Sequence, residues 1–170
     1  MTAKGYRKVL VTGGAGFIGS HLVDGLLNEG FMVVVLDDLS TGRLENIKDH
    51  LNEEGFRFIQ GDIRDREVLR RALNGVDAVF HLAAITSVPY SVEHPDVTFE
   101  VNVGGTRVLL ESCLDSNVGR FIYVSTCAVY GDPKYLPIDE EHPTEPISPY
   151  AESKLKAERL CLSFYEDYDL

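Results

Sequence analysis

A tyrosine and a lysine stand four residues apart in the stretch SPYAESKLKAE, and this pair could carry acid–base chemistry. The stretch is typical of the start of a helix, where residues at i and i+4 share one face, so Tyr150 and Lys154 are expected to be neighbours. An ammonium within about 4–6 Å favours phenolate over phenol and equips a tyrosine as a general base. A second pair at this spacing, Tyr130 and Lys134, encloses a glycine and a proline, which exclude a helix there.

Two hydroxyl residues, Ser125 and Thr126, follow the apolar stretch RFIYV. If they close a strand of a parallel sheet, they lie at the edge of the sheet where ligands bind. A hydroxyl in that place either binds a substrate oxygen or caps the end of the strand, and the residues alone leave both functions open.

Three glycines at three-residue spacing, Gly13, Gly16 and Gly19, follow the apolar run KVLVT and open an amphipathic run. In such a turn the glycines allow a tight bend, a close approach of the backbone to a pyrophosphate, and close packing of the helix. The helix N-terminus then offers free N–H groups to the phosphates. A second apolar run ends in Asp37, roughly 20 residues further on, where a carboxylate accepts hydrogen bonds from a ribose 2′-hydroxyl and repels a 2′-phosphate. The combination predicts a site for NAD rather than NADP, with Arg43 nearby as a residue that would favour the 2′-phosphate.

Alternating apolar and amphipathic segments must position these residues. Strands are expected at 8–12, 32–37, 56–60, 77–82 and 120–125, and helices near 17–29, 66–74, 97–116 and 150–167. Repeated strand–helix–strand units form right-handed crossovers, so the predicted fold class is α/β, a doubly wound parallel sheet of the Rossmann type. The proline-rich segment 131–149 is predicted to be a long loop at the carboxyl edge of the sheet, either functional or merely exposed.

Length and composition predict one soluble domain, since 44% of the 170 residues are hydrophobic and no apolar run reaches the roughly 20 residues of a membrane span. A net charge of −11 argues against nucleic acid as a partner. Three cysteines without CxxC spacing and the absence of a leader-like N-terminus predict a reducing, cytoplasmic setting. His21 and His81 are interpreted as packing or hydrogen-bonded residues, and no metal site is predicted.

In combination, these motifs resemble the extended short-chain dehydrogenase/reductase family, a family of NAD-dependent epimerases and dehydratases, and within it the UDP-glucose 4-epimerase group. The resemblance implies NAD-binding residues in five segments of the chain. They are Gly13, Gly16, Phe17, Ile18 and Gly19; Asp37, Asp38, Leu39, Ser40, Thr41 and Gly42; Asp62 and Ile63; Leu82, Ala83, Ala84 and Thr86; and Asn102, on the helix that supports the active site.

The same resemblance implies three catalytic residues, Tyr150, Lys154 and Thr126, of which the first two also contact the cofactor. Tyr150, as phenolate, removes the proton of a sugar C4 hydroxyl while the hydride passes to NAD, and the 4-keto sugar then turns and takes the hydride back on its other face. Lys154 lowers the tyrosine pKa and holds ribose hydroxyls, and Thr126 hydrogen-bonds the reacting oxygen. The implied substrate is a nucleotide-sugar, a UDP-hexose such as UDP-glucose or UDP-galactose.

One departure from the family separates its reactions. In the related dehydratases the two residues after the catalytic hydroxyl are acidic or end in Glu, whereas here they are Cys127 and Ala128. Neither serves as a carboxyl acid or base, so the sequence favours epimerisation over dehydration. Cys127 is interpreted as a small space-filling residue rather than a reactive thiol.

A second departure concerns length, because family members continue into a sixth strand and a small domain that holds the nucleotide-sugar. Residues 1–170 are therefore expected to be an incomplete NAD-binding Rossmann domain, truncated before strand six and without the substrate domain. Two alternatives stay open: a non-catalytic NAD-binding half-domain that needs a partner chain, and another nucleotide-sugar oxidoreductase of the same family. The resemblance also implies a homodimer formed through the helices at 97–116 and 150–167.

Overall fold

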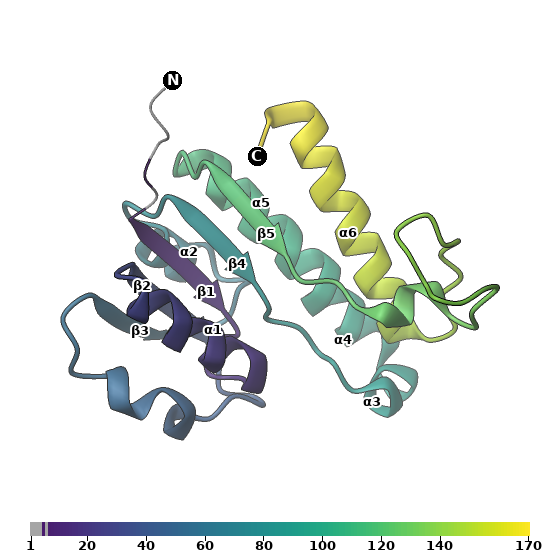
Figure 1. Cartoon of the computed structure of the whole chain (residues 1–170), viewed down its shortest axis with the longest axis horizontal. Helices are drawn as coiled ribbons and strands as arrows, with labels where there is room; N and C mark the ends of the chain where they lie inside the picture. Colours follow the sequence, from purple (N-terminus) through teal and green to yellow (C-terminus); the bar gives the residue numbers. More distant parts are fainter. Residues whose placement is uncertain (1–4, 6) are drawn as a thin grey trace.

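A computed structural model of the chain describes residue 5 and residues 7–170. Within this part, five parallel strands form one sheet in the order β3-β2-β1-β4-β5 (Figure 1). The strands are β1 (Lys8–Thr12), β2 (Met32–Asp37), β3 (Phe56–Gln60), β4 (Ala78–His81) and β5 (Arg120–Tyr123). The predicted α/β doubly wound parallel sheet is confirmed, and the first three strands have the predicted bounds.

Helical segments connect the strands. They are α1 (Phe17–Asn28), η1 (Leu44–His50), α2 (Arg66–Ala72), α3 (Val88–Glu93), α4 (Pro95–Phe99), η2 (Glu100–Gly105), α5 (Thr106–Asp115), η3 (Cys127–Tyr130) and α6 (Pro149–Tyr168). The helix predicted at 97–116 consists of α4, η2 and α5 in direct succession, and η2 is a turn of π-helix. The sequence pattern did not reveal α3, η1 or η3. None of the helices in the described residues is long and apolar enough for a membrane span.

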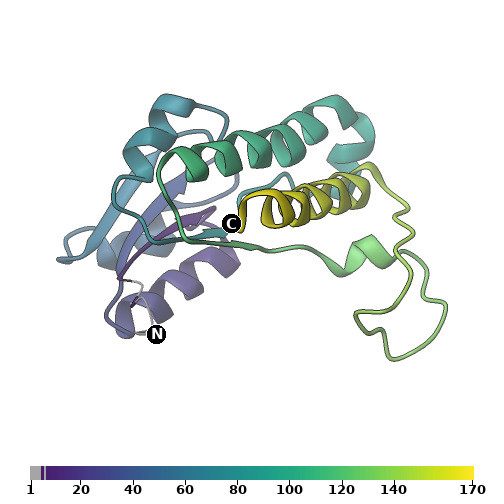
Figure 2. The ribbon, with the colours of Figure 1, turned by 90° about the horizontal axis from the view of Figure 1, so that it is seen from above.

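Apolar side chains on both faces of the sheet form two separate clusters. On one face, Leu10 and Val79 pack with Leu69 of α2 and Leu109 of α5. On the other face, the cluster includes strand valines, α1 and Ile47 of η1. Figure 2 shows α1 and α5 on opposite sides of the sheet. The central strands β1 and β2 are almost continuously apolar because both faces of the sheet are covered there.

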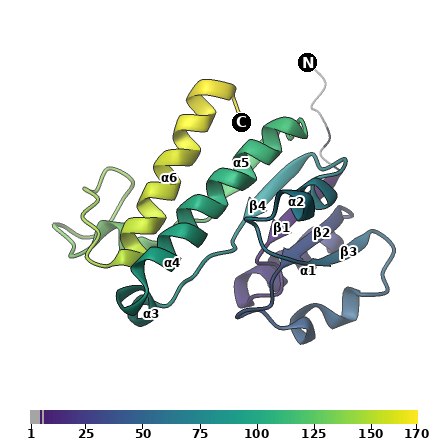
Figure 3. The same cartoon turned by 180° about the vertical axis from the view of Figure 1, so that it is seen from behind.

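Helix α6 lies alongside α4, η2 and α5, as the views from the front and from behind agree (Figures 1 and 3). It begins at Pro149, with Ser148 as a cap whose Oγ accepts a hydrogen bond from the N–H of Ala151 at 3.2 Å. A proline is favoured in the first turn of a helix because its missing N–H would have no partner there. The predicted Tyr–Lys pair therefore lies in the first two turns of a genuine helix.

Residues 131–148 form the predicted long loop, which contains no helix or strand. It extends away from the sheet beyond the start of α6 (Figure 1). A buried histidine, His142, organises it: Nε2 accepts the N–H of Lys134 at 3.0 Å, and the rings of Tyr130 and Tyr135 lie against the imidazole. The Lys134 ammonium pairs with Glu145 at 2.7 Å, so the second Tyr–Lys pair of the sequence is engaged in holding this loop.

Candidate active site

The turn between β1 and α1 is closed so tightly that two of its positions have no room for a side chain. Gly13 has φ +70°, and its N–H donates to the carbonyl of Leu36 at 2.8 Å. A Cβ at Gly13 would lie 2.7 Å from the backbone nitrogen of Ala83, and one at Gly19 would lie 2.2 Å from the carbonyl oxygen of Gly13. The spacing of the glycines is therefore a steric requirement of this turn.

Helix α1 begins at Phe17 with Gly16 as its cap and no side-chain hydrogen bond there. The first two side chains of the helix are open to solvent, Phe17 being 80% and Ile18 65% exposed. The first N–H groups of a helix lack intrahelical acceptors and carry the positive end of the helix dipole. The first N–H groups of α1 therefore lie at an accessible end of the helix, and the binding of a pyrophosphate there stays a prediction.

Asp37 ends β2 and is 7% exposed. Its carboxylate accepts the N–H of Ala15 at 2.9 Å and the N–H of Leu39 at 2.9 Å, so it joins the glycine turn to the following loop. Burial raises the pKa of Asp37, while these two hydrogen bonds oppose that rise. A carboxylate has about four acceptor positions, which leaves room for a ribose hydroxyl beside the two backbone donors.

The loop after Asp37 is held by its own contacts. Asp38 is exposed and accepts both the N–H of Ser40 at 2.9 Å and its hydroxyl at 2.6 Å. A Cβ at Gly42 would lie 2.6 Å from an oxygen of Asp37, so the loop folds back onto that carboxylate. Leu39 has φ +62° and Thr41 is exposed. The loop of residues 37–42, which is predicted to contact adenosine, is therefore compact and lies beside the glycine turn.

The predicted adenine-side residues Asp62 and Ile63 lie against the π-helical turn. Arg64 pairs with Asp62 at 2.5 Å and with Glu100 of η2 at 2.6 Å, and it lowers the pKa of Asp62 through hydrogen bonds. Ile63 is buried, and its side chain would meet a Cβ at Gly105 at 2.6 Å. The loop after β3 is thereby fixed to η2.

Asn102 of η2 is 2% exposed, and its amide is fully engaged within the protein. Its Oδ1 accepts the N–H of Ile85 at 2.8 Å, and its Nδ2 donates to the Ile85 carbonyl at 3.0 Å and to Ser153 Oγ at 2.9 Å. It therefore joins the segment after β4 to α6. In that segment Leu82, Ala83 and Ala84 are partly buried and Thr86 is exposed.

Lys154 is 4% exposed. Its Nζ donates to the carbonyl of Val124 at 2.6 Å and lies 4.2 Å from the centroid of the Tyr123 ring. Burial lowers the pKa of Lys154 to about 8, against opposing contributions from Cys161 and Glu158. Tyr150 is half-buried, and its N–H donates to Ser91 Oγ of α3 at 3.1 Å.

The structure corrects the expectation that Ser125 and Thr126 close the fifth strand. Pairing with β4 ends at Tyr123, and both hydroxyl residues lie in the extended segment beyond it. Ser125 Oγ donates to Glu158 of α6 at 2.5 Å, whereas Thr126 Oγ1 accepts the N–H of Ala128 at 3.2 Å as the cap of η3. Within the described part of the chain, no acceptor is assigned to the Thr126 hydroxyl proton, which leaves it available to a bound oxygen.

Cys127 is exposed, so its interpretation as a space-filling residue is wrong. It lies at the start of η3, where the chain turns outward, and no core needs filling there. His81 is buried and hydrogen-bonded through both ring nitrogens, as interpreted from the sequence, and His21 is exposed with Nδ1 2.8 Å from the carbonyl of Phe17.

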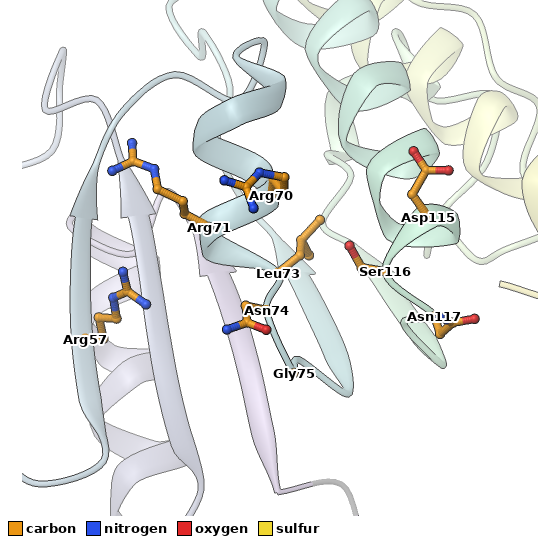
Figure 4. Close-up of a pocket in the computed structure, with 9 residues that line it drawn as sticks. All are labelled: Arg57, Arg70, Arg71, Leu73, Asn74, Gly75, Asp115, Ser116 and Asn117. Carbon is orange, nitrogen blue, oxygen red and sulfur yellow. The ribbon is translucent and has the colours of Figure 1, made fainter.

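The glycine turn, Asp37 and the segments after β4 and β5 follow the carboxyl ends of parallel strands, which lie at one edge of the sheet. Asn102 and Lys154 lie on η2 and α6, and their hydrogen bonds to Ile85 and Val124 join these helices to that edge. Ser153 and Glu158 belong to the same arrangement, and sequence reasoning missed both. A separate pocket of about 530 Å³ lies at the opposite edge, and its lining includes Arg57, Arg70 and Arg71 (Figure 4). None of the predicted site residues lines it.

Comparisons with known proteins show the family to which the chain belongs. The model of the family described as GDP-mannose 4,6 dehydratase matches residues 10–170. A putative UDP-glucose 4-epimerase of Methanocaldococcus jannaschii is 42% identical over 152 residues, which cover 88% of this chain and 48% of that protein.

Two solved structures show the same fold. UDP-glucose 4-epimerase from Brucella ovis, in complex with NAD, is 40% identical with a TM-score of 0.89, over 96% of this chain and 49% of that one. DesIV, a dTDP-glucose 4,6-dehydratase from Streptomyces venezuelae with NAD and TYD bound, is 42% identical with a TM-score of 0.91, over 96% of this chain and 53% of that one. The chain spans about half the length of the curated relatives that it matches. It belongs to the GDP-mannose 4,6 dehydratase family, among the nucleotide-sugar epimerases and dehydratases that its motifs resemble.

Proposed function

We propose that this chain is the NAD-binding part of a nucleotide-sugar 4-epimerase, with UDP-glucose and UDP-galactose as the substrate pair. The observation that carries the proposal is the buried Lys154 ammonium on the helix of Tyr150, at the sheet edge that also holds the glycine turn. A cation in that place suits a tyrosine that must act as a base. The epimerases among the relatives support the same reaction.

The glycine turn fits a dinucleotide, because a Cβ at Gly13 or Gly19 would collide with backbone atoms where a pyrophosphate needs close approach. The buried Asp37 carboxylate favours a ribose with a free 2′-hydroxyl, which selects NAD over NADP. The structures from Brucella ovis and Streptomyces venezuelae hold NAD, in agreement with this choice. NAD, when bound, supplies the acceptor and donor of hydride.

The residues of the chain then divide the proton chemistry. Tyr150 takes the proton of the C4 hydroxyl and returns it after the 4-keto sugar has turned. Lys154 stabilises the phenolate by its charge and holds ribose hydroxyls, while the Thr126 hydroxyl donates a hydrogen bond to the reacting oxygen. Tyr150, Lys154 and Thr126 are thus the proposed catalytic residues.

Epimerisation is preferred to dehydration because elimination of water needs a further acid and base beside the reacting sugar. The two residues after Thr126 are Cys127 and Ala128, and neither carries a carboxyl group. Both reactions occur among the similar structures, so product analysis with several nucleotide-sugars is the measurement that separates them. A 4-keto-6-deoxy product would contradict the proposal.

The proposal extends to organisation. Residues 1–170 are the NAD-binding unit, and another segment or chain supplies the substrate-selecting pocket. A homodimer forms through α6 and the succession of α4, η2 and α5, where Val97, Leu162 and Tyr165 are exposed. Sedimentation equilibrium tests this, and a strictly monomeric profile would contradict it. A non-catalytic NAD-binding half-domain that needs a partner chain is the second candidate. A cytoplasmic location stays a prediction from composition.

Calorimetric titration of the chain with NAD, and with NADP in parallel, tests the cofactor site. We expect saturable binding of NAD and at least about tenfold weaker binding of NADP, because one repelled phosphate near Asp37 corresponds to about 1.4 kcal/mol or more. Equal affinities would contradict the role given to Asp37. A folded chain that binds neither nucleotide would contradict the site as a whole.

A further inference from the structure

A continuous run of buried hydrogen bonds connects the glycine turn to the first turn of α6. It starts at Thr12, the last residue of β1, whose Oγ1 lies 2.6 Å from His81 Nδ1. The other ring nitrogen, His81 Nε2, lies 2.9 Å from Thr106 Oγ1. Thr12, His81 and Thr106 are each at most 1% exposed, so water does not compete for these bonds.

The run continues through the π-helical turn. Thr106 Oγ1 donates to the carbonyl of Asn102 at 2.6 Å, and the Asn102 amide donates to Ser153 Oγ at 2.9 Å. Ser153 Oγ in turn donates to the carbonyl of Tyr150 at 2.7 Å. Each buried hydroxyl in this run therefore both donates and accepts.

The neighbouring hydrogen-bond donors determine which ring nitrogen of His81 carries the proton. Because the Thr106 hydroxyl donates its hydrogen bond to the carbonyl of Asn102, its oxygen must accept a hydrogen bond from His81 Nε2–H. Nδ1 is then the acceptor of the Thr12 hydroxyl, whose oxygen also accepts the N–H of Ala83 at 3.3 Å. Burial lowers the pKa of His81 to about 3, and the nearby Lys154 charge acts in the same direction, which agrees with a neutral ring.

We infer that His81, as the neutral Nε2–H tautomer, is a positioning residue that sets the distance between the glycine turn and the helix carrying Asn102, and thereby fixes the first turn of α6. The positioning role rests on the proposed function, since it serves the NAD site and Tyr150. His81 touches neither substrate nor cofactor in this role. It acts through Thr12 on one side and through Thr106 on the other.

The tautomer is tested on the chain by ¹⁵N NMR of the histidine rings, without any ligand. We expect His81 to carry its proton on Nε2 and to stay neutral between pH 5 and pH 9, given its pKa of about 3. A proton on Nδ1, or a titration near pH 6.5, would overturn the inference. This result does not depend on whether the chain binds NAD.

Two variants test the two hydrogen bonds of His81 separately. His81→Gln keeps a donor for Thr106 and loses the acceptor for Thr12, and His81→Asn does the reverse. For each we expect NAD affinity to fall about fivefold, the factor that one hydrogen bond of about 1 kcal/mol represents, and the Ile85 amide to exchange faster. Val79→Ala, on the same strand and equally buried, is the matched control, because it removes packing without a hydrogen bond.

If Val79→Ala loses as much NAD affinity and as much protection of the Ile85 amide as the His81 variants, the positioning role is wrong and His81 is an ordinary core residue. If the His81 variants do not fold, Thr106→Val and Thr106→Ser make the same comparison. Val removes the acceptor for His81 with little change of shape, and Ser restores it. If the unmodified chain does not bind NAD, the proposed function fails, while the Ile85 exchange comparison still decides the positioning role.

Discussion

Replacement of Gly19 by alanine should weaken NAD binding by up to about a hundredfold. The added Cβ would lie 2.2 Å from the carbonyl oxygen of Gly13 and 2.8 Å from the Cα of Gly14. Both are backbone atoms of the turn, so relief requires the turn itself to move away from the position that a pyrophosphate needs. Strain of about 1–3 kcal/mol is typical of such overpacking and corresponds to a loss of up to about a hundredfold. Calorimetry with NAD measures the affinity, and denaturant unfolding measures the accompanying destabilisation.

Gly25→Ala is the matched control in the same helix. A Cβ at Gly25 would meet nothing within 4 Å, and the position is in the interior of α1. Alanine should therefore stabilise the chain by about 0.5–1 kcal/mol and leave NAD affinity unchanged. Gly19→Ala with an affinity within a few-fold of the unmodified chain would show that the turn does not contact the cofactor.

Tyr150→Phe should remove turnover while NAD affinity stays nearly unchanged. The change deletes one hydroxyl, and the backbone bonds of residue 150 to Ser91 and Ser153 remain, so the start of α6 keeps its place. Loss of a general base typically lowers the rate by about 10²–10⁴-fold. The measurement is the interconversion of UDP-glucose and UDP-galactose by a form of the protein that is active without the substitution. The NAD affinity of the variant is measured in parallel by titration.

The control for this variant is Tyr130→Phe, the same change in the second Tyr–Lys pair of the sequence. Lys134 is committed to Glu145 and the Tyr130 ring to His142, so this tyrosine has no ammonium partner at its spacing. We expect its turnover to be retained. Retained turnover in Tyr150→Phe, or equal losses of turnover in both variants, would contradict the assignment of Tyr150 as the general base.

The central strands could be predicted from the sequence because their apolar runs are long and buried on both faces. The fifth strand was predicted two residues too long, since periodicity does not reveal where a partner ends. β4 stops at His81, which pairs with Tyr123 and accepts the N–H of Val124 at 3.2 Å, and Ser125 then has no strand beside it. The π-helical turn at Asn102 is equally hidden, because it inserts into a segment whose pattern is helical throughout.

The site shows the same division. Gly13, Gly19 and Asp37 carry local signals, a turn followed by an acid at a fixed distance. Glu158 and Ser153 carry none: their partners, Ser125 and Asn102, lie 33 and 51 residues away, and only the folded sheet brings them together. Asp37 was predicted to contact the ribose, but its bond to the N–H of Ala15, 22 residues away, is a tertiary contact that the sequence spacing does not reveal.

The burial of Lys154, a proposed catalytic residue, makes the free energy of unfolding depend on pH. Its pKa falls from 10.5 to about 8, so between these values the unfolded chain holds more protons and the contribution of Lys154 to stability rises with pH. Below pH 8 the full penalty applies, on the order of 3 kcal/mol. A search for more stable variants at neutral pH would therefore select apolar replacements of Lys154, and the proteins it recovered would fold better and have lost the cation that is proposed to assist Tyr150.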